Sequence, residues 1–187
     1  MRENDDDMRK LAAYTIPFVG LKIGSHEFEY EIGKEFFEHF EYEDFNSANL
    51  HVDLVLEKKA TMMELFFETS GTVNVNCDLT NEPFDMPITG SLRLVVNFGD
   101  EFNDENEELL ILPHGEYEIN IAQYVYEIIV LAVPHKRIHP GIEDGTLKSD
   151  VLDKLEELSP KGTNEDNDNE ENIDPRWNKL KNLLNDK

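Results

Sequence analysis

The sequence is poor in cysteine and in basic residues, and it lacks long hydrophobic runs. Its single cysteine, Cys77, excludes an intramolecular disulfide framework and is typical of a reducing compartment. Only 17 Lys and Arg stand against 41 Asp and Glu among 187 residues, so the formal net charge is −24. Such a charge disfavours broad binding to nucleic acid or anionic lipid, because both are polyanions. The absence of a membrane-spanning run and of a signal-peptide pattern predicts a cytoplasmic protein.

Hydrophobic residues make up 39% of the chain, which is enough for the core of one domain. We expect a flexible N-terminus over residues 1–12 and an α+β domain over residues 13–159. Residues 160–173 contain almost nothing that can pack, which predicts a disordered acidic linker. Residues 174–187 are expected to form a short amphipathic helix.

Apolar residues alternate with polar ones through much of the domain, which is the pattern of half-buried strands. The alternating sets are Tyr14, Ile16 and Phe18; Phe28, Tyr30 and Ile32; Leu50, Val52, Leu54 and Leu56; Met63, Leu65 and Phe67; Val73, Val75 and Cys77; and Leu92, Leu94, Val96 and Phe98. Glu27, Glu29 and Glu31 interleave with the second set, so that strand is expected to present a row of carboxylates to water. Ser70-Gly71 lies between two sets and predicts a tight hairpin connection.

The links between these strands are short, whereas a parallel crossover needs a dozen or more residues. We therefore expect a mostly antiparallel β-sheet, or a partly open barrel, with two or three packed helices. One strand is expected to begin after the region of Pro83 and Pro87. Residues 100–108 are predicted to form an acidic loop that precedes a brief strand over residues 109–112.

Three segments have apolar residues at helical spacing. These residues are Phe36, Phe37 and Phe40 in the first, Ile121, Val125, Ile128, Ile129 and Ala132 in the second, and Leu147, Val151, Leu152, Leu155 and Leu158 in the third. The first predicts a short helix lying on the sheet. Asn120 and Gln123 predict a capping box at the start of the second helix, and Pro134 ends it.

The C-terminal segment reverses the charge of the chain. Pro175 after Asp174 is a common helix start, and Trp177, Leu180 and Leu184 share one face of the expected helix. Its basic residues are Arg176, Lys179, Lys181 and Lys187. A locally basic amphipathic helix on a flexible tether is typical of a docking element.

No metal, cofactor or enzymatic site is expected. His135 and His139 have a ligand-like spacing, and Cys77 and His114 are further candidates, but Pro134 ends the helix before both histidines. The favoured interpretation is exposed loop histidines and a buried, inert cysteine. The sequence has no Gly-rich phosphate loop, nucleophile elbow or H-E-x-x-H motif, so catalysis is disfavoured.

One compact positive patch lies in the body of the chain. Lys136 and Arg137, flanked by His135 and His139, follow the long apolar helix. Two interpretations stay open, contact with a phosphate or a solvated loop after a helix. Glu127 lies inside that apolar helix, where a carboxylate needs a partner or an exposed edge.

Four motifs occur in an order that resembles a known family. They are Val75-Asn76-Cys77-Asp78, the segment from Glu116 to Ile121, the segment from Glu127 to Pro134, and Asp174-Pro175-Arg176-Trp177-x-x-Leu180. From about Tyr14 to Leu184 the chain resembles the YceD family, the large ribosomal RNA subunit accumulation proteins. In that family a strand-to-helix segment ends in E-x-x-x-L-A-x-P, and a Pro-aromatic-x-x-Leu helix closes the chain. The matching positions include Cys77, Glu127, Pro134 and Pro175.

The resemblance implies a non-enzymatic bacterial factor for the synthesis, processing or stability of large-subunit (23S) ribosomal RNA. Many members carry a C-x-R-C pattern on the strand and further cysteines after the helix, which suggests a metal site. Here Asp78, Leu79 and Thr80 follow Cys77, so the second cysteine and the arginine are missing. We therefore expect no metal ion.

Three functions remain as hypotheses. The first is an adaptor whose acidic body binds a basic ribosomal protein or a large-subunit assembly intermediate. The second is direct RNA binding, with Trp177 stacking on a base. The third and least favoured is a carboxylate- and Mg²⁺-dependent hydrolase. The candidate binding residues are His135, Lys136, Arg137, His139, Arg176, Trp177, Lys179, Leu180 and Lys181; no membrane or DNA partner is expected.

Overall fold

The computed structural model describes residues 11–158, so the linker and C-terminal helix expected beyond residue 159 lie outside the described residues. The chain divides into two units, residues 1–149 and residues 150–187. In the second unit the described residues form α5 (Asp150–Leu158), which confirms most of the third helical pattern. Leu147 precedes that helix. No helix within residues 11–158 is long and apolar enough to cross a membrane.

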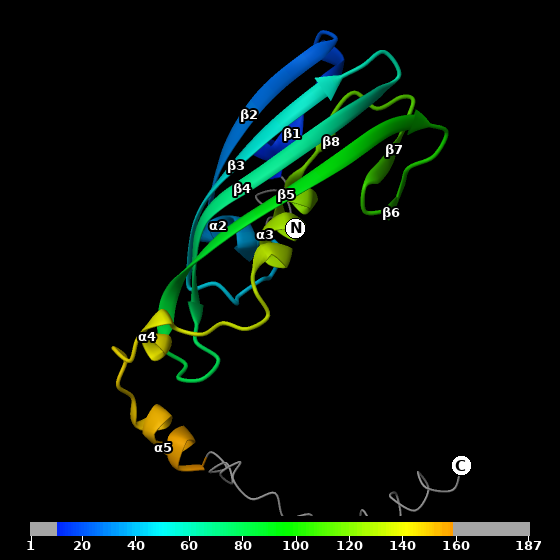
Figure 1. The fold of residues 1–187 in the computed structure, drawn as a ribbon. Coiled ribbons are helices and arrows are strands. Elements are labelled where there is room, and N and C mark those ends of the chain that lie inside the picture. Colours follow the sequence, from blue (N-terminus) through cyan, green and yellow to red (C-terminus); the bar gives the residue numbers. More distant parts are fainter. Residues whose placement is uncertain (1–10, 159–187) are drawn as a thin grey trace, which may run out of the picture. The chain divides into compact units, whose positions relative to one another are not determined.

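An open six-stranded sheet dominates the first unit (Figure 1). Its strands lie in the order β2 (Gly24–Gly33), β3 (Ser47–Lys58), β4 (Met62–Asn76), β5 (Pro83–Gly99), β7 (Leu109–Pro113) and β6 (Asn103–Asn106). A second sheet pairs β1 (Thr15–Ile16) with β8 (Ile119–Asn120). Most pairs are antiparallel, which confirms the predicted α+β class and the mostly antiparallel sheet.

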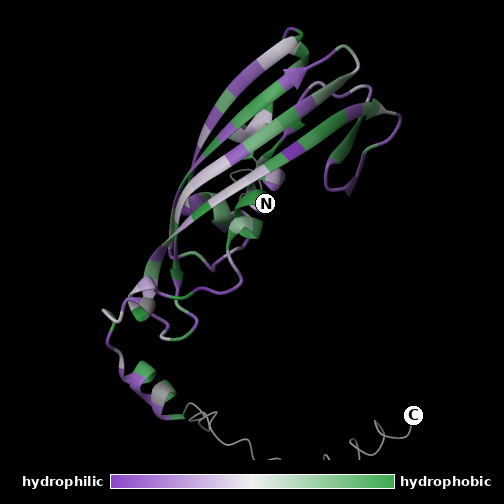
Figure 2. Cartoon of the chain, viewed as in Figure 1, coloured by the Kyte–Doolittle hydropathy of each residue, from purple (hydrophilic) through white to green (hydrophobic). Residues whose placement is uncertain are grey.

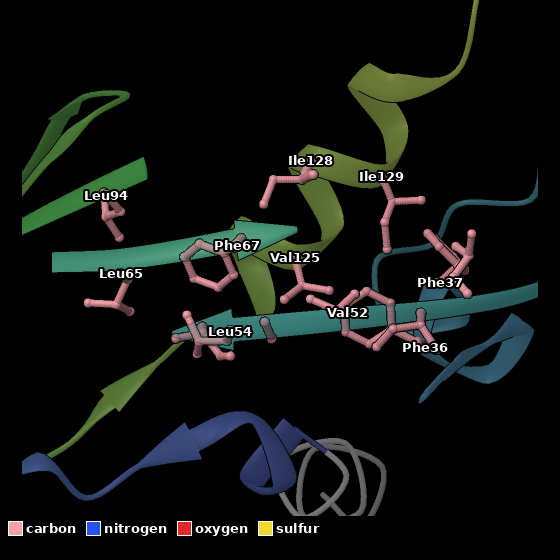
Figure 3. Close-up of a cluster of buried hydrophobic side chains, with 14 of the residues drawn as sticks. Phe36, Phe37, Val52, Leu54, Leu65, Phe67, Leu94, Val125, Ile128 and Ile129 are labelled. Carbon is pink, nitrogen blue, oxygen red and sulfur yellow. The ribbon is translucent and has the colours of Figure 1, made fainter. Parts of the chain in front are cut away.

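The core lies on one face of this sheet, beneath α2 (Lys34–Glu38) and α3 (Ala122–Ala132). Figure 3 shows α3 directing Val125, Ile128 and Ile129 toward strand residues such as Val52 and Phe67. Burying each side chain of this kind contributes about 1.5–3 kcal/mol. The rings of Phe40, which follows α2, and Tyr126 of α3 stack with centroids 4.3 Å apart and join the two helical segments. Short helices η1 (Ala12–Tyr14), η2 (Phe18–Gly20) and α4 (Pro140–Glu143) complete the unit.

The opposite face of the sheet is polar. Hydropathy alternates along the strands in Figure 2, as expected where successive side chains point to opposite faces. In β2, Glu27, Glu29 and Glu31 are exposed while Ile32 is buried. The predicted row of carboxylates is therefore confirmed.

The predicted hairpin at Ser70-Gly71 is wrong, because both residues lie inside the 15-residue strand β4. Gly71 has φ +144, and a Cβ there would lie 2.3 Å from the backbone oxygen of Asn49. The glycine thus permits a close approach between strands and does not mark a turn.

Two further expectations about the strands need correction. β5 begins at Pro83 and includes Pro87, and the acidic segment 100–108 contains β6, whose residues are all exposed. β5 and β7 are parallel neighbours despite their short connection. This arrangement is feasible because β6 runs back along the outer side of β7, so the chain returns without a helical crossover.

The N-terminal strand and the helix cap also differ from expectation. The strand expected over Tyr14–Phe18 is reduced to Thr15–Ile16, because 3₁₀ turns precede and follow it. The side chain of Asn120 accepts a hydrogen bond from the Ala122 N–H, but Gln123 bonds Glu127 and so does not complete the capping box.

Candidate functional site

The predicted positive patch lies in the segment that follows α3 and runs beside the end of β4. The Asp78 N–H donates to the Arg137 carbonyl at 2.8 Å, and the Arg137 N–H donates to the Asp78 carboxylate at 2.7 Å. The Arg137 guanidinium lies 3.6 Å from a carboxylate oxygen of Asp78 and 3.6 Å from one of Asp44. Its positive charge is therefore directed at two acidic partners within the fold.

The two histidines of the patch have different environments. His139 is half-buried; its Nδ1 accepts from the Gly141 N–H at 2.9 Å at the start of α4, and its ring lies 5.4 Å from that of Phe84. His135 and Lys136 are exposed. The patch thus contains one exposed pair and one pair engaged in holding the segment in place.

Cys77 is buried at the end of β4 and accepts a hydrogen bond from the His139 N–H at 3.3 Å. Burial raises the pKa of its thiol, but hydrogen bonds from Thr80 and from nearby backbone N–H groups lower it more, so the net pKa lies below the ordinary value. Cys77 is the single cysteine of the chain, so its thiol has no disulfide partner within it. Within residues 11–158, no group of three or more His, Cys, Asp or Glu is placed to hold a metal ion.

Two further family positions lie on or after α3. Glu127 is exposed and its Oε1 accepts from the Gln123 side chain at 2.7 Å, which is the expected exposed helix edge. Pro134 follows the last residue of α3, Ala132, and its C-cap Val133. Pro175, Arg176, Trp177, Lys179, Leu180 and Lys181 lie outside the described residues.

Carboxylates gather on the solvent-facing side of four adjacent strands. We call this surface the carboxylate face; its members are Glu27, Glu29, Glu31, Asp53, Glu57, Glu64, Glu68 and Asp85. In the register, Glu29 is directly opposite Asp53, and Asp53 is directly opposite Glu68. Like charges placed directly opposite each other destabilise a sheet. Glu29, Asp53 and Glu68 therefore form a row across three strands, and the repulsion among them destabilises the sheet until a cation binds nearby.

Cationic groups of the fold offset part of this cost. Lys59 and Arg93 each lie 2.8 Å from a carboxylate oxygen of Glu64, and hydrogen bonds from Lys59 and then Arg93 lower the pKa of that carboxyl. His51 lies between Glu31 and Asp53, with ring nitrogen–oxygen distances of 2.9 and 3.1 Å. The hydrogen bond to Glu31 is the largest cause and raises the His51 pKa. Desolvation lowers it by less, and the hydrogen bond to Asp53 adds a further, smaller rise, so the net pKa is above the ordinary value.

A groove of about 1070 Å³ lies between β5, the β6–β7 hairpin and α3. Its apolar lining residues, which we call the floor, include Leu92, Phe102, Leu110, Leu112, Ile119, Ile128 and Leu131. Its acidic lining residues are Asp104, Glu107, Glu116, Glu118 and Glu127, and no Lys, Arg or His lines it among the described residues. The groove thus combines an apolar floor with negative charge contributed by three segments of the chain.

Tyr124 reports the acidity of the groove. Burial, followed by the charges of Asp104 and Glu127, raises the pKa of its hydroxyl to about 12. Asp104 belongs to β6 and Glu127 to α3, so carboxylates from both sides of the groove act on one side chain.

The groove was not predicted from the sequence, although two of its residues carried a signal. Leu131 is off the predicted apolar face of the helix and its side chain is 82% exposed. Phe102 interrupts the acidic segment and is 57% exposed. Large apolar residues at such positions are candidates for contact with a partner.

Comparison with known proteins identifies a family. A family model described as "Large ribosomal RNA subunit accumulation protein YceD" matches residues 65–184, well over half of the chain. The match begins inside β4, so β2 and β3 lie outside the matched residues. Comparisons with curated proteins and with solved structures gave no match. The chain belongs to the YceD family, whose name denotes a role in the accumulation of large-subunit ribosomal RNA.

Proposed function

We propose that this protein is a non-enzymatic ribosome-biogenesis factor that acts in the bacterial cytoplasm by binding a basic ribosomal protein or an assembling large subunit. The observation that carries the proposal is the row of Glu29, Asp53 and Glu68 across three paired strands. Their repulsion lowers the stability of the sheet, and a bound cationic partner removes that cost. Family membership supports the connection with large-subunit RNA.

The sign of the charge favours a protein partner over RNA. A negative surface attracts basic proteins and speeds their association, whereas it repels the phosphate backbone. Direct RNA binding through the predicted patch is less favoured, because the Arg137 guanidinium already faces Asp44 and Asp78. The attraction to a basic partner is expected to weaken with salt, since these carboxylates are largely solvent-exposed.

Affinity purification of the full chain at low salt tests the proposal. We expect mass spectrometry to identify basic large-subunit proteins or precursor particles, and recovery of neither would contradict the proposal. The E27Q/E29Q/E31Q variant should recover several-fold less and show a weaker salt dependence. The control variant E38Q/E41Q/E43Q removes the same charge from exposed positions in and after α2 and should recover as much as wild type.

A second measurement separates the RNA alternative. The variant K136E/K179E/K181E reverses charges of the predicted RNA contacts and leaves the carboxylate face intact. Loss of RNA retention in this variant, with protein recovery unchanged by E27Q/E29Q/E31Q, would favour direct RNA binding over the proposed function.

A further inference from the structure

One edge of β5 is unpaired where it enters the groove. β7 pairs with β5 from Val95 to Gly99 only, and no other described strand pairs with that side of β5 before Val95. The Val95 N–H points toward β7, because it donates to the Glu108 carbonyl at 2.8 Å. Backbone groups of alternate residues point the same way along a strand, so those of Arg93, Ser91 and Thr89 point to the open side.

The groove is formed around this open edge. Four consecutive β5 residues, Thr89 to Leu92, line it. Side chains of consecutive strand residues point to opposite faces, so four in succession indicate that the groove meets the strand along its backbone edge. Pro87 has no N–H and lies in the same alternation as Thr89, so the row of donors ends there.

Natural sheets usually protect such an edge. Covering elements, prolines and charges are common devices, and a long uncovered edge can pair with another chain. Here Pro87 closes one end and β7 the other, which leaves a short open ladder beside an apolar floor. Leu131 remains 82% exposed next to it, whereas Ile128, one turn earlier on α3, is buried.

We propose that this groove binds an extended basic segment of a protein partner, which adds as a strand to the open edge of β5. Alternate apolar side chains of the segment pack on Leu92, Ile128 and Leu131, and its Lys or Arg side chains face the acidic rim. The assignment rests on the proposed function, because the partner is taken to be a basic protein. Strand addition supplies the backbone hydrogen bonds, and the floor and rim select the sequence.

The occupant is argued from charge and shape. The rim contributes Asp104, Glu107, Glu116, Glu118 and Glu127, and no described lining residue is basic. An RNA strand would bring phosphates to these carboxylates, and the acidic domain of a second copy of this chain would add like charge. A basic extended segment can pair with the open edge of β5, pack on the apolar lining residues and place its positive charges beside the acidic ones.

The test uses the full chain and a peptide of about eight alternating Lys and Val residues, with binding followed by fluorescence anisotropy. We expect saturable binding, with no binding of the matching Glu-Val peptide. Leu131→Lys should weaken the affinity about tenfold by adding a positive charge and removing apolar contact. Ile23→Lys makes a comparable change at a 72% exposed position before β2 and should alter the affinity less than about twofold.

Strand addition is distinguished from charge attraction by two N-methylated peptides. One carries N-methyl groups on all odd residues and the other on all even residues, so each loses the hydrogen-bond donors of one edge. We expect one of them to lose binding and the other to retain it. The unmethylated Lys-Val peptide should also slow hydrogen exchange at the backbone amides of Thr89, Ser91 and Arg93 of the protein. Equal binding of both methylated peptides, without amide protection, would overturn the proposal.

The remaining outcomes separate the groove from the proposed function. Recovery of basic large-subunit proteins without peptide binding overturns the groove assignment and leaves the proposed function standing. Peptide binding without such recovery supports the groove and contradicts the proposed function. A dimer of the chain that Leu131→Lys dissociates, or an RNA oligonucleotide that the peptide displaces, would assign the groove to another occupant and overturn the proposal.

Discussion

The carboxylate face and the groove are both acidic, but they differ in what lies beside their carboxylates. On the carboxylate face, the side chains project from the solvent-facing side of paired strands, away from any strand edge, and the nearby cations Lys59 and Arg93 already bind Glu64. In the groove, the carboxylates surround apolar side chains and an unpaired length of β5.

This difference suits the two surfaces to different tasks, attracting a partner and fixing its position. Charges on an open surface act over distance, raise the association rate and are screened by salt. An apolar floor and a row of backbone donors act at contact, and they fix the direction and register of a bound segment. We therefore expect the carboxylate face to attract a basic partner and the groove to hold one part of it.

The largest expected effect comes from Gly71, which supports the carboxylate face. A Cβ at this position would lie 2.3 Å from the Asn49 backbone oxygen and 2.8 Å from the Leu50 Cα, in a backbone conformation that L-residues rarely adopt. Gly71→Ala should therefore lower the free energy of unfolding by about 3 kcal/mol or more, measured by urea denaturation. Gly115→Ala has open space around the new Cβ and should change stability by less than about 0.5 kcal/mol. Equal stability of the two variants would contradict the tight β3–β4 approach.

A smaller effect is expected at Gly90, which supports the groove. Its Cβ would meet the Ile128 Cγ2 at 2.9 Å and the Ala132 Cβ at 3.3 Å, and both atoms lie close to the backbone of α3, so relief requires a small movement of that helix. Gly90→Ala should cost about 1–2 kcal/mol by overpacking and should displace α3 from β5. Lys-Val peptide binding should weaken while salt-dependent partner recovery stays near wild type.

A second substitution checks the cause of the Gly90 effect. Leu has no methyl branch at Cβ, so adding Ile128→Leu to Gly90→Ala removes the shortest contact while keeping the apolar volume. Partial recovery of stability and peptide binding is expected. A double variant that is less stable than Gly90→Ala alone would show that the Ile128 contact is not the cause.

The strands with strict alternation could be predicted from the sequence. In β2, the exposed Glu27 to Glu31 and the buried Ile32 follow the pattern directly. Ser70-Gly71 has the residue types of a turn, but the alternation of buried residues continues through it. Phe67 and Val73 are six positions apart, an even number, so one continuous strand buries both.

The groove could not be predicted from the sequence, because residues from separate segments of the chain come together to form it. Its floor joins Leu92 of β5, Leu110 of β7 and Leu131 of α3, and each lies in a different segment. β6 is entirely polar and all its residues are exposed, so no alternation in the sequence marks it as a strand. It forms through pairing with β7. The open edge of β5 follows from where β7 stops pairing, which is a tertiary property.

The smallest expected effect separates the two surfaces by their response to pH. Each ring nitrogen of His51 lies near a carboxylate, and both nitrogens donate hydrogen bonds only in the protonated ring. Its folded-state pKa is raised above the ordinary value of about 6.5, so its stabilising contribution is complete below that value and is lost as pH rises through the folded pKa. The difference in Tm between wild type and His51→Gln should therefore be larger near pH 5.5 than near pH 8.5. It should be small at both, because the site is exposed.

The groove has no histidine in its described lining and its Tyr124 has a pKa of about 12, so Lys-Val peptide affinity should stay constant between about pH 6 and pH 8. A peptide affinity that follows the His51 titration would place the bound segment on the carboxylate face and remove the distinction between the two surfaces.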